Sequence, residues 1–126
     1  MQTSPSTPLN GVTATTVSRA VNVNGVERVT LAFTRSGHVS GSAIFTVQAS
    51  IDGKAGGSFI SNVNLIPNDP NNHTQTVERQ ITVELGENDT QFYALDLENF
   101  CYDYIQVKVV ESGTGESTCK ILAVNC

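Results

Sequence analysis

The chain has 126 residues, with 7 Lys plus Arg against 12 Asp plus Glu and a formal net charge of -5. This length suits one domain with a sizeable core and is short for two. Lys and Arg form no cluster, which argues against a nucleic-acid partner, because binding phosphates needs grouped positive charge. Charged residues make up only 15 % of the chain, below the roughly 25 % of average soluble proteins. The Thr, Ser, Asn, Val and Gly that replace them favour extended chain and turns.

The first eleven residues, MQTSPSTPLNG, offer little to bury. We expect residues 1–11 to form an extended N-terminal arm, either a frayed terminus or an arm that crosses onto a neighbouring subunit. A single β-sandwich domain is expected over residues 12–126. The segment has neither the cationic nor the apolar region of a secretory signal. No apolar run approaches the roughly 20 residues of a membrane span, so we expect a soluble protein that is synthesised in the cytoplasm and has no membrane partner.

Alternating apolar and polar residues, interrupted by turn signals, predict about eight strands. The predicted strands lie at residues 12–23, 28–34, 43–51, 59–66, 77–85, 92–97, 105–109 and 118–124. Asn24-Gly25, between the first two, is a strong hairpin signal. Helical periodicity is absent beyond a turn or two, so the expected fold class is all-β, an antiparallel β-sandwich of jelly-roll or immunoglobulin-like type.

The final stretch, residues 100–126, is predicted to form a C-terminal β-hairpin that turns at residues 112–116. The register that matches apolar with apolar side chains sets Val109 opposite Cys119. It also sets Val107 opposite Ile121. The two strands of this hairpin are therefore expected to be neighbours in one sheet.

The three cysteines, Cys101, Cys119 and Cys126, cannot all pair within one chain. In the hairpin register Cys101 lies about eight residues, or roughly 26 Å, from the point opposite Cys119, which is too far for a disulfide. Cys126 comes near Cys101 along the strand, but the two side chains lie on opposite faces unless a β-bulge intervenes. We expect three free thiols, which suits a reducing compartment. Neither His38 nor His73 is close to a cysteine in the sequence, which weighs against a catalytic cysteine.

A few polar groups could in principle carry chemistry. Asp96, Glu98 and Asp103 could form an acid/base pair or a calcium site, and residues 68–74 loosely resemble a cation-binding loop. Residues 53–57 have the composition of a phosphate-binding loop without its pattern or its following helix. Solvated charges and turns explain all of these better. We therefore expect no catalytic residue, no bound metal or cofactor, and no enzymatic activity.

The tyrosines allow a second interpretation. Tyr93, Tyr102 and Tyr104 could line a platform for sugar rings, as exposed aromatic residues do in carbohydrate-binding sandwiches. Rings within alternating strands more often pack in a core or at an interface. A carbohydrate-binding module stays as an alternative.

The last predicted strand is apolar on both faces, because residues 121–124 read Ile-Leu-Ala-Val. Val110 on the strand before it repeats the pattern. One face belongs to the core, and the other is expected to be covered by a second subunit, by the N-terminal arm, or by a loop of the same chain. The residues expected at an interface are Leu122, Val124, Val110, Tyr102, Tyr104, Pro5 and Pro8.

Three motifs in this order resemble small β-sandwich structural proteins of tailed bacteriophages and prophages. They are VQASIDG at residues 47–53, YDYIQVKV at residues 102–109 and Gly-Thr-Gly at residues 113–115. The resemblance covers residues 42–124 and implies a structural protein of the virion, made in the host cytoplasm. It implies a capsid auxiliary or decoration protein, or else a tail- or fibre-associated component. The implied partners are the major capsid or tail protein and further copies of the chain, such as a trimer.

Overall fold

The computed structural model describes residues 6–50, 59, 63–67, 79–83, 90–97 and 102–124. These residues contain ten strands and no helix. The strands are β1 (Ser6–Val12), β2 (Thr16–Val17), β3 (Val21–Asn22), β4 (Arg28–Ser40), β5 (Ala43–Ser50), β6 (Leu65–Pro67), β7 (Ile81–Val83), β8 (Gln91–Leu95), β9 (Tyr104–Glu111) and β10 (Thr114–Val124).

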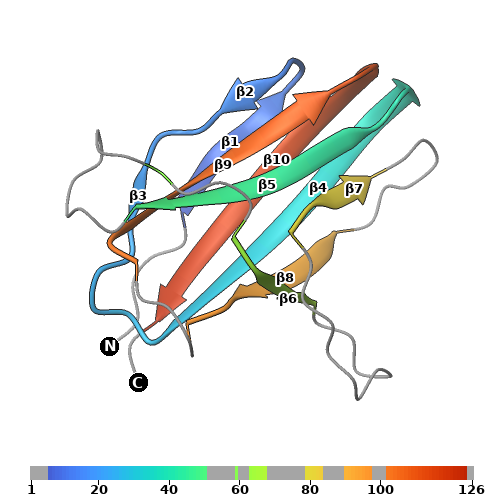
Figure 1. Ribbon diagram of the computed structural model, residues 1–126. Helices are drawn as coiled ribbons and strands as arrows, with labels where there is room; N and C mark the ends of the chain where they lie inside the picture. The colour runs from blue at the N-terminus through green and yellow to red at the C-terminus, as the bar shows by residue number, and fades with distance from the viewer. Residues whose placement is uncertain are drawn as a thin grey trace.

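Two antiparallel sheets pack face to face (Figure 1). The first sheet has the order β1-β10-β4-β8-β6. The second has the order β2-β9-β5-β7, and β3 also pairs with β9. The predicted all-β antiparallel sandwich is thus confirmed.

The core lies between the sheets and follows the alternation in the sequence. Every second side chain of β4, β5, β9 and β10 points inward, as Leu31, Phe45, Val107 and Ile121 do, and all four are at most 1 % exposed. The ring centroids of Phe33 and Phe45 are 4.8 Å apart and join the two sheets. Each such side chain stabilises the fold by about 1.5–3 kcal/mol on burial, so these four strands supply most of the hydrophobic stabilisation.

The prediction of a C-terminal β-hairpin is wrong. β9 pairs with β5, with Val109 opposite Phe45, and β10 pairs with β4, with Cys119 opposite Phe33. The two strands therefore belong to opposite sheets, and the turn at residues 112–113 carries the chain across the sandwich. A tight Gly-containing turn between two alternating strands fits either a hairpin or such a crossing, and the partners of each strand decide between them.

The same crossing recurs along the chain. From β3 to β10, successive described strands alternate between the two sheets. Gly25, at φ +76°, makes the turn predicted at Asn24-Gly25, but β3 and β4 on either side of it lie in different sheets. The predicted strand 12–23 is divided into β2 and β3, and β4 extends six residues beyond the predicted end at residue 34.

The predicted N-terminal arm is, from Ser6 onward, a strand of the sheet. β1 pairs antiparallel with β10 and places Leu9 in the core at 1 % exposure. From its Pro, Ser and Thr content the segment was expected to bury little, but Leu9 is an apolar residue within it. Its burial, together with the edge of β10 that is available for pairing, explains why the segment forms a strand of the sheet and not a free arm.

Candidate functional site

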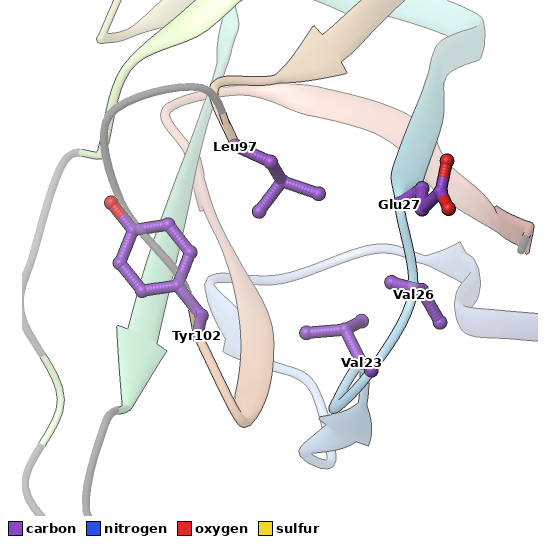
Figure 2. A pocket seen from close by; sticks show the side chains of 6 residues that line it. Val23, Val26, Glu27, Leu97 and Tyr102 are labelled. Carbon is purple, nitrogen blue, oxygen red and sulfur yellow. The ribbon is translucent and has the colours of Figure 1, made fainter.

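A hollow opens at the end of the sandwich where β4 begins (Figure 2). It has a volume of about 430 Å³. Its lining residues are Val23, Gly25, Val26, Glu27, Leu97 and Tyr102. Leu97 and Tyr102 form one wall and the two valines the opposite wall, as Figure 2 shows. The walls are therefore mainly apolar.

Backbone hydrogen bonds hold these residues in place. The Val23 N–H donates to the Asp103 carbonyl at 2.8 Å, next to Tyr102, and the Val26 N–H donates to the Val23 carbonyl at 3.3 Å. Asn24 Nδ2 donates to Asp103 Oδ1 at 2.6 Å. The β3–β4 connection is thus tied to the segment that leads into β9, and the hollow lies between them.

Within the hollow, the electrostatic effects act on Tyr102. Burial raises the pKa of its phenol above 10.0, and the nearby carboxylate of Asp96 raises it further. The hydroxyl is therefore neutral at physiological pH and can donate a hydrogen bond. Glu27 is exposed at the rim and is the acidic residue of the lining.

A second hollow of about 650 Å³ adjoins the first. It shares Glu27 and Leu97 with it and extends along Ile66 and Ala94 of β6 and β8. Together they form a continuous surface in which apolar side chains alternate with polar groups such as Glu27 and Thr30. Such a surface is suited to holding apolar side chains of a partner.

The opposite end of the sandwich is closed by a buried ion pair. Arg35 on β4 and Glu111 on β9 have side chains that are 0 % and 2 % exposed. The Arg35 guanidinium donates from Nε to Glu111 Oε1 at 3.2 Å, and to the carbonyls of Ser40 and Gly41 at 2.9 and 3.1 Å. Glu111 Oε2 also accepts from the Gly113 N–H at 3.0 Å. Both buried charges therefore have partners, as burial of charge requires.

Glycines let the backbone approach this ion pair closely. A Cβ at Gly115 would lie 2.7 Å from Arg35 Nε, and one at Gly113 would lie 2.1 Å from the Ser40 carbonyl oxygen. The two turns also exchange hydrogen bonds, from Ser112 N–H to the Ser42 carbonyl and from Ser42 N–H to Ser112 Oγ, both at 3.0 Å. These contacts hold the two turns closely against one another.

The sequence analysis missed this ion pair, although a signal was present. Arg35 continues the inward-facing series of Leu31 and Phe33, and Glu111 continues that of Val107 and Val109. A charge at a core-facing position of a strand needs a buried partner of opposite sign. Two such charges, one directly after the predicted strand 28–34 and one at the end of β9, could have been matched to one another.

The predicted acidic group is not assembled as a metal site. Asp103 binds Asn24, and Asp96 lies buried near Tyr102, while Glu98 lies outside the described residues. Among the residues that the structure describes, no three His, Cys, Asp or Glu side chains gather as metal ligands would. Residues 53–57 and 68–74 and the side chain of His38 are likewise outside the description.

The three tyrosines do not share a surface. Tyr93 is 8 % exposed and packs in the core, with its ring centroid 5.8 Å from that of Phe33. Tyr102 lines the hollow, and Tyr104 lies on the outward-facing series of β9. A sugar platform made of all three is therefore contradicted.

The predicted interface residues are divided between the two outer faces. Leu122 is half-buried on the outer face of the first sheet, whereas Val110, 38 % exposed, lies on that of the second. This follows from the placement of β9 and β10 in opposite sheets. Pro8 lies in β1, while Pro5 and the side chain of Val124 fall outside the description.

The outer face of the first sheet carries an aromatic residue that the sequence analysis did not single out. Phe92 on β8 is 48 % exposed and pairs with Ala32 of β4. Thr30, two residues earlier on β4, pairs with Leu122. Phe92 and Leu122 thus lie on one face, separated by the small residues of β4.

Cys119 is a free, buried cysteine, as predicted. Burial raises the pKa of its thiol far above the ordinary range, which keeps it protonated and unreactive. Cys101 and Cys126 lie outside the described residues. The register argument that kept Cys101 from Cys119 was based on the incorrect hairpin.

In the part of the chain that the structure describes, no helix is long and apolar enough to cross a bilayer. No protein-family model matches the chain, and no curated protein matches it in sequence. Among solved structures, the chain is similar to the crystal structure of YomS, a protein derived from the SPBc2 prophage. The TM-score is 0.68 with 13 % sequence identity, and the match covers 95 % of this chain and 90 % of that one. At this identity the likeness demonstrates a shared fold.

Proposed function

We propose that this chain is a non-enzymatic structural protein of a bacteriophage particle, most specifically a capsid auxiliary or decoration protein that binds and stabilises the head lattice. One observation carries the proposal. The fold matches that of a prophage-derived protein over nearly the full length of both chains. The motifs at residues 47–53, 102–109 and 113–115 independently resemble those of phage β-sandwich proteins.

The surfaces of the molecule support a binding role. One end offers adjoining hollows lined by both apolar and polar side chains around Leu97 and Tyr102, and the outer face of the first sheet carries Phe92 and Leu122. Aromatic and aliphatic side chains at such positions are typical anchors of protein–protein contacts. The partners proposed are the major capsid protein or a tail protein.

Mass spectrometry of particles purified from the phage or induced lysogen that encodes the chain tests this proposal. A head decoration protein is expected at a copy number comparable to that of the major capsid protein. A tail or fibre component, the second form of the proposal, is expected at a few copies per particle. A chain that is present in the lysate but absent from the particles contradicts both forms.

The proposal includes self-association, as a trimer or another closed homo-oligomer. Leu122→Asp places a charge on the outer face of the first sheet and is expected to give folded monomer in light scattering. Val17→Asp is the matched control, since Val17 is 49 % exposed on the opposite sheet. An oligomer whose size is unchanged by Leu122→Asp would remove that face from the interface.

A further inference from the structure

The edge strand β1 is attached to the first sheet less regularly than the other long strands. Its pairing with β10 matches Ser6 with Ile121, Leu9 with Cys119 and Val12 with Ser117, and the register shifts between each of these pairs. On its other side, β10 stays in register with β4 without interruption from Glu116 to Val124. The ladder of β1 is thus broken twice within seven residues.

Leu9 is the one fully buried residue of β1, and Val12 packs partly buried against the core. Leu9 is 1 % exposed, whereas the other residues of the strand are half-buried or exposed. Gly11, at φ +64°, donates its N–H to Thr118 Oγ1 at 3.1 Å, where one of the register shifts occurs. Without β1, β10 would present an open edge and an empty place for Leu9, which only a strand of matching sequence would fill.

The connection that follows β1 is short for the distance it spans. β1 ends at Val12 in the first sheet and β2 begins at Thr16 in the second, on the same side of the sandwich (Figure 1). Residues 13–15, all exposed, make this crossing. Stacked sheets lie about 10 Å apart, and an extended chain advances about 3.3 Å per residue. Four Cα–Cα steps join Val12 to Thr16, about 13 Å when extended, so the link is short without being fully extended, and short links favour the exchange of a terminal strand between subunits.

We propose that β1 is exchanged between neighbouring copies of this chain, so that β1 of each copy pairs with β10 of the next and inserts its Leu9 beside Cys119 there. The partner is a second copy, because it carries the same strand, whose Leu9 fits the vacated place. Exchange keeps every contact of β1 and lets residues 11–15 straighten. This inference rests on the self-association included in the proposed function and specifies its geometry.

The register between Leu9 and Cys119 provides a direct test. Directly opposite residues of antiparallel strands lie within disulfide distance. In a background of Cys101→Ser and Cys126→Ser, one variant carries Leu9→Cys with Cys119→Ser, and a second keeps Leu9 and Cys119. A disulfide can then form only between chains. After mixing, incubation and prolonged mild oxidation, a covalent heterodimer is expected on a non-reducing gel, at about ten times the yield of the control below.

The control variant carries Asn10→Cys with Cys119→Ser in the same background. Asn10 is exposed on the same strand, so its cross-linking measures random collisions. A heterodimer yield for Leu9→Cys that does not exceed this background overturns the proposal. A single chain with both Leu9→Cys and Cys119 that oxidises entirely to disulfide-bonded monomer also overturns it.

A second experiment does not depend on replacing a core residue. Inserting Gly-Ser-Gly-Ser between Thr13 and Ala14 relaxes the link, so that β1 can pair within its own chain. We expect light scattering to show a shift from oligomer to monomer, with an apparent Kd weaker by about tenfold or more. The same insertion between Asn24 and Gly25, an exposed turn, is expected to leave the oligomer intact. An unchanged oligomer after the first insertion, or a native chain that is monomeric throughout, contradicts exchange.

The experiments can refute either proposal, the particle role or the strand exchange, without refuting the other. A chain that is absent from particles but forms the heterodimer refutes the particle role and leaves exchange standing. A chain that is abundant in particles but gives no cross-link above the control refutes exchange alone.

Discussion

The two ends of the sandwich are built from different interactions. At one end Arg35 and Glu111 are fully buried and bonded to one another and to the turns around Gly41 and Gly113. At the other end apolar side chains such as Val23 and Leu97 leave an open hollow beside Tyr102. The buried charges of the closed end are satisfied by groups of the same chain, whereas the open end leaves apolar side chains lining a hollow.

Because of this difference, we expect mutations at the closed end to change stability and mutations at the open end to change binding. Removing one member of a buried charged pair leaves the other charge without a partner, which is among the most destabilising single changes. Changes at the rim of an open hollow alter what it can bind at little cost to folding. The predictions below test this contrast in order of decreasing expected effect.

Replacing one member of the ion pair is expected to have the largest effect. Glu111→Ala or Arg35→Ala should lower the free energy of unfolding by about 3–5 kcal/mol, because each leaves a buried charge unpaired. Urea denaturation followed by circular dichroism measures the loss. The double replacement Arg35→Met with Glu111→Met should cost much less than the sum of the single losses. Additive losses would show that the two side chains do not act as a pair.

Gly113→Ala tests the tight packing of the turns at the closed end. A Cβ there would meet the Ser40 carbonyl oxygen at 2.1 Å and Gly41 Cα at 2.8 Å, so backbone must move. We expect a loss of about 1–3 kcal/mol, the usual cost of overpacking, measured by the same denaturation. A variant as stable as the native chain would mean that these turns can separate freely.

Gly25→Ala is the counterpart at the open end. No atom lies within 4 Å of its Cβ position, but the backbone has φ +76°, which costs a non-glycine residue about 1 kcal/mol. Gly25→Asn should recover part of this loss, because Asn tolerates the left-handed region better. A loss as large as that of Gly113→Ala would contradict the open character of this end.

Tyr102 gives a small, pH-dependent effect. Burial, followed by the Asp96 charge, raises the pKa of Tyr102 above 10.0 in the fold. The neutral phenol therefore stabilises the folded state below pH 10, and this contribution is lost as pH rises through the folded pKa. Denaturation of the native chain and of Tyr102→Phe is compared from neutral pH to about pH 11. The native chain is expected to lose more stability over the alkaline part, and parallel losses would show that Tyr102 is solvated as in the unfolded chain.

Local pattern predicted much of the fold. Alternation of apolar residues identified strands at β4, β5, β8, β9 and β10 and the side chains that face the core, because the two-residue period of a strand is a local property. The β-rich composition with frequent turn signals indicated an antiparallel sandwich. Cys119 was correctly expected to be a free thiol, although the register used to argue it was wrong.

The local pattern did not indicate which strands pair with one another. Asn24-Gly25 and Ser112-Gly113 both look like hairpin turns, yet each carries the chain from one sheet to the other. A turn specifies how the chain reverses, whereas its strands pair with whichever distant segments bury their apolar faces best. The predicted interface was divided for the same reason, since Leu122 and Val110 lie on opposite outer faces.

By itself the sequence determined the strands, the inward-facing positions and the fold class, all of which follow from the spacing of side chains along one strand. The tertiary structure alone decided that Arg35 meets Glu111, that Leu9 turns the expected arm into β1, and that Tyr102 lines a hollow. Each of these joins residues far apart in the chain. Their free energy arises only when two sheets come together, so no local pattern could predict it.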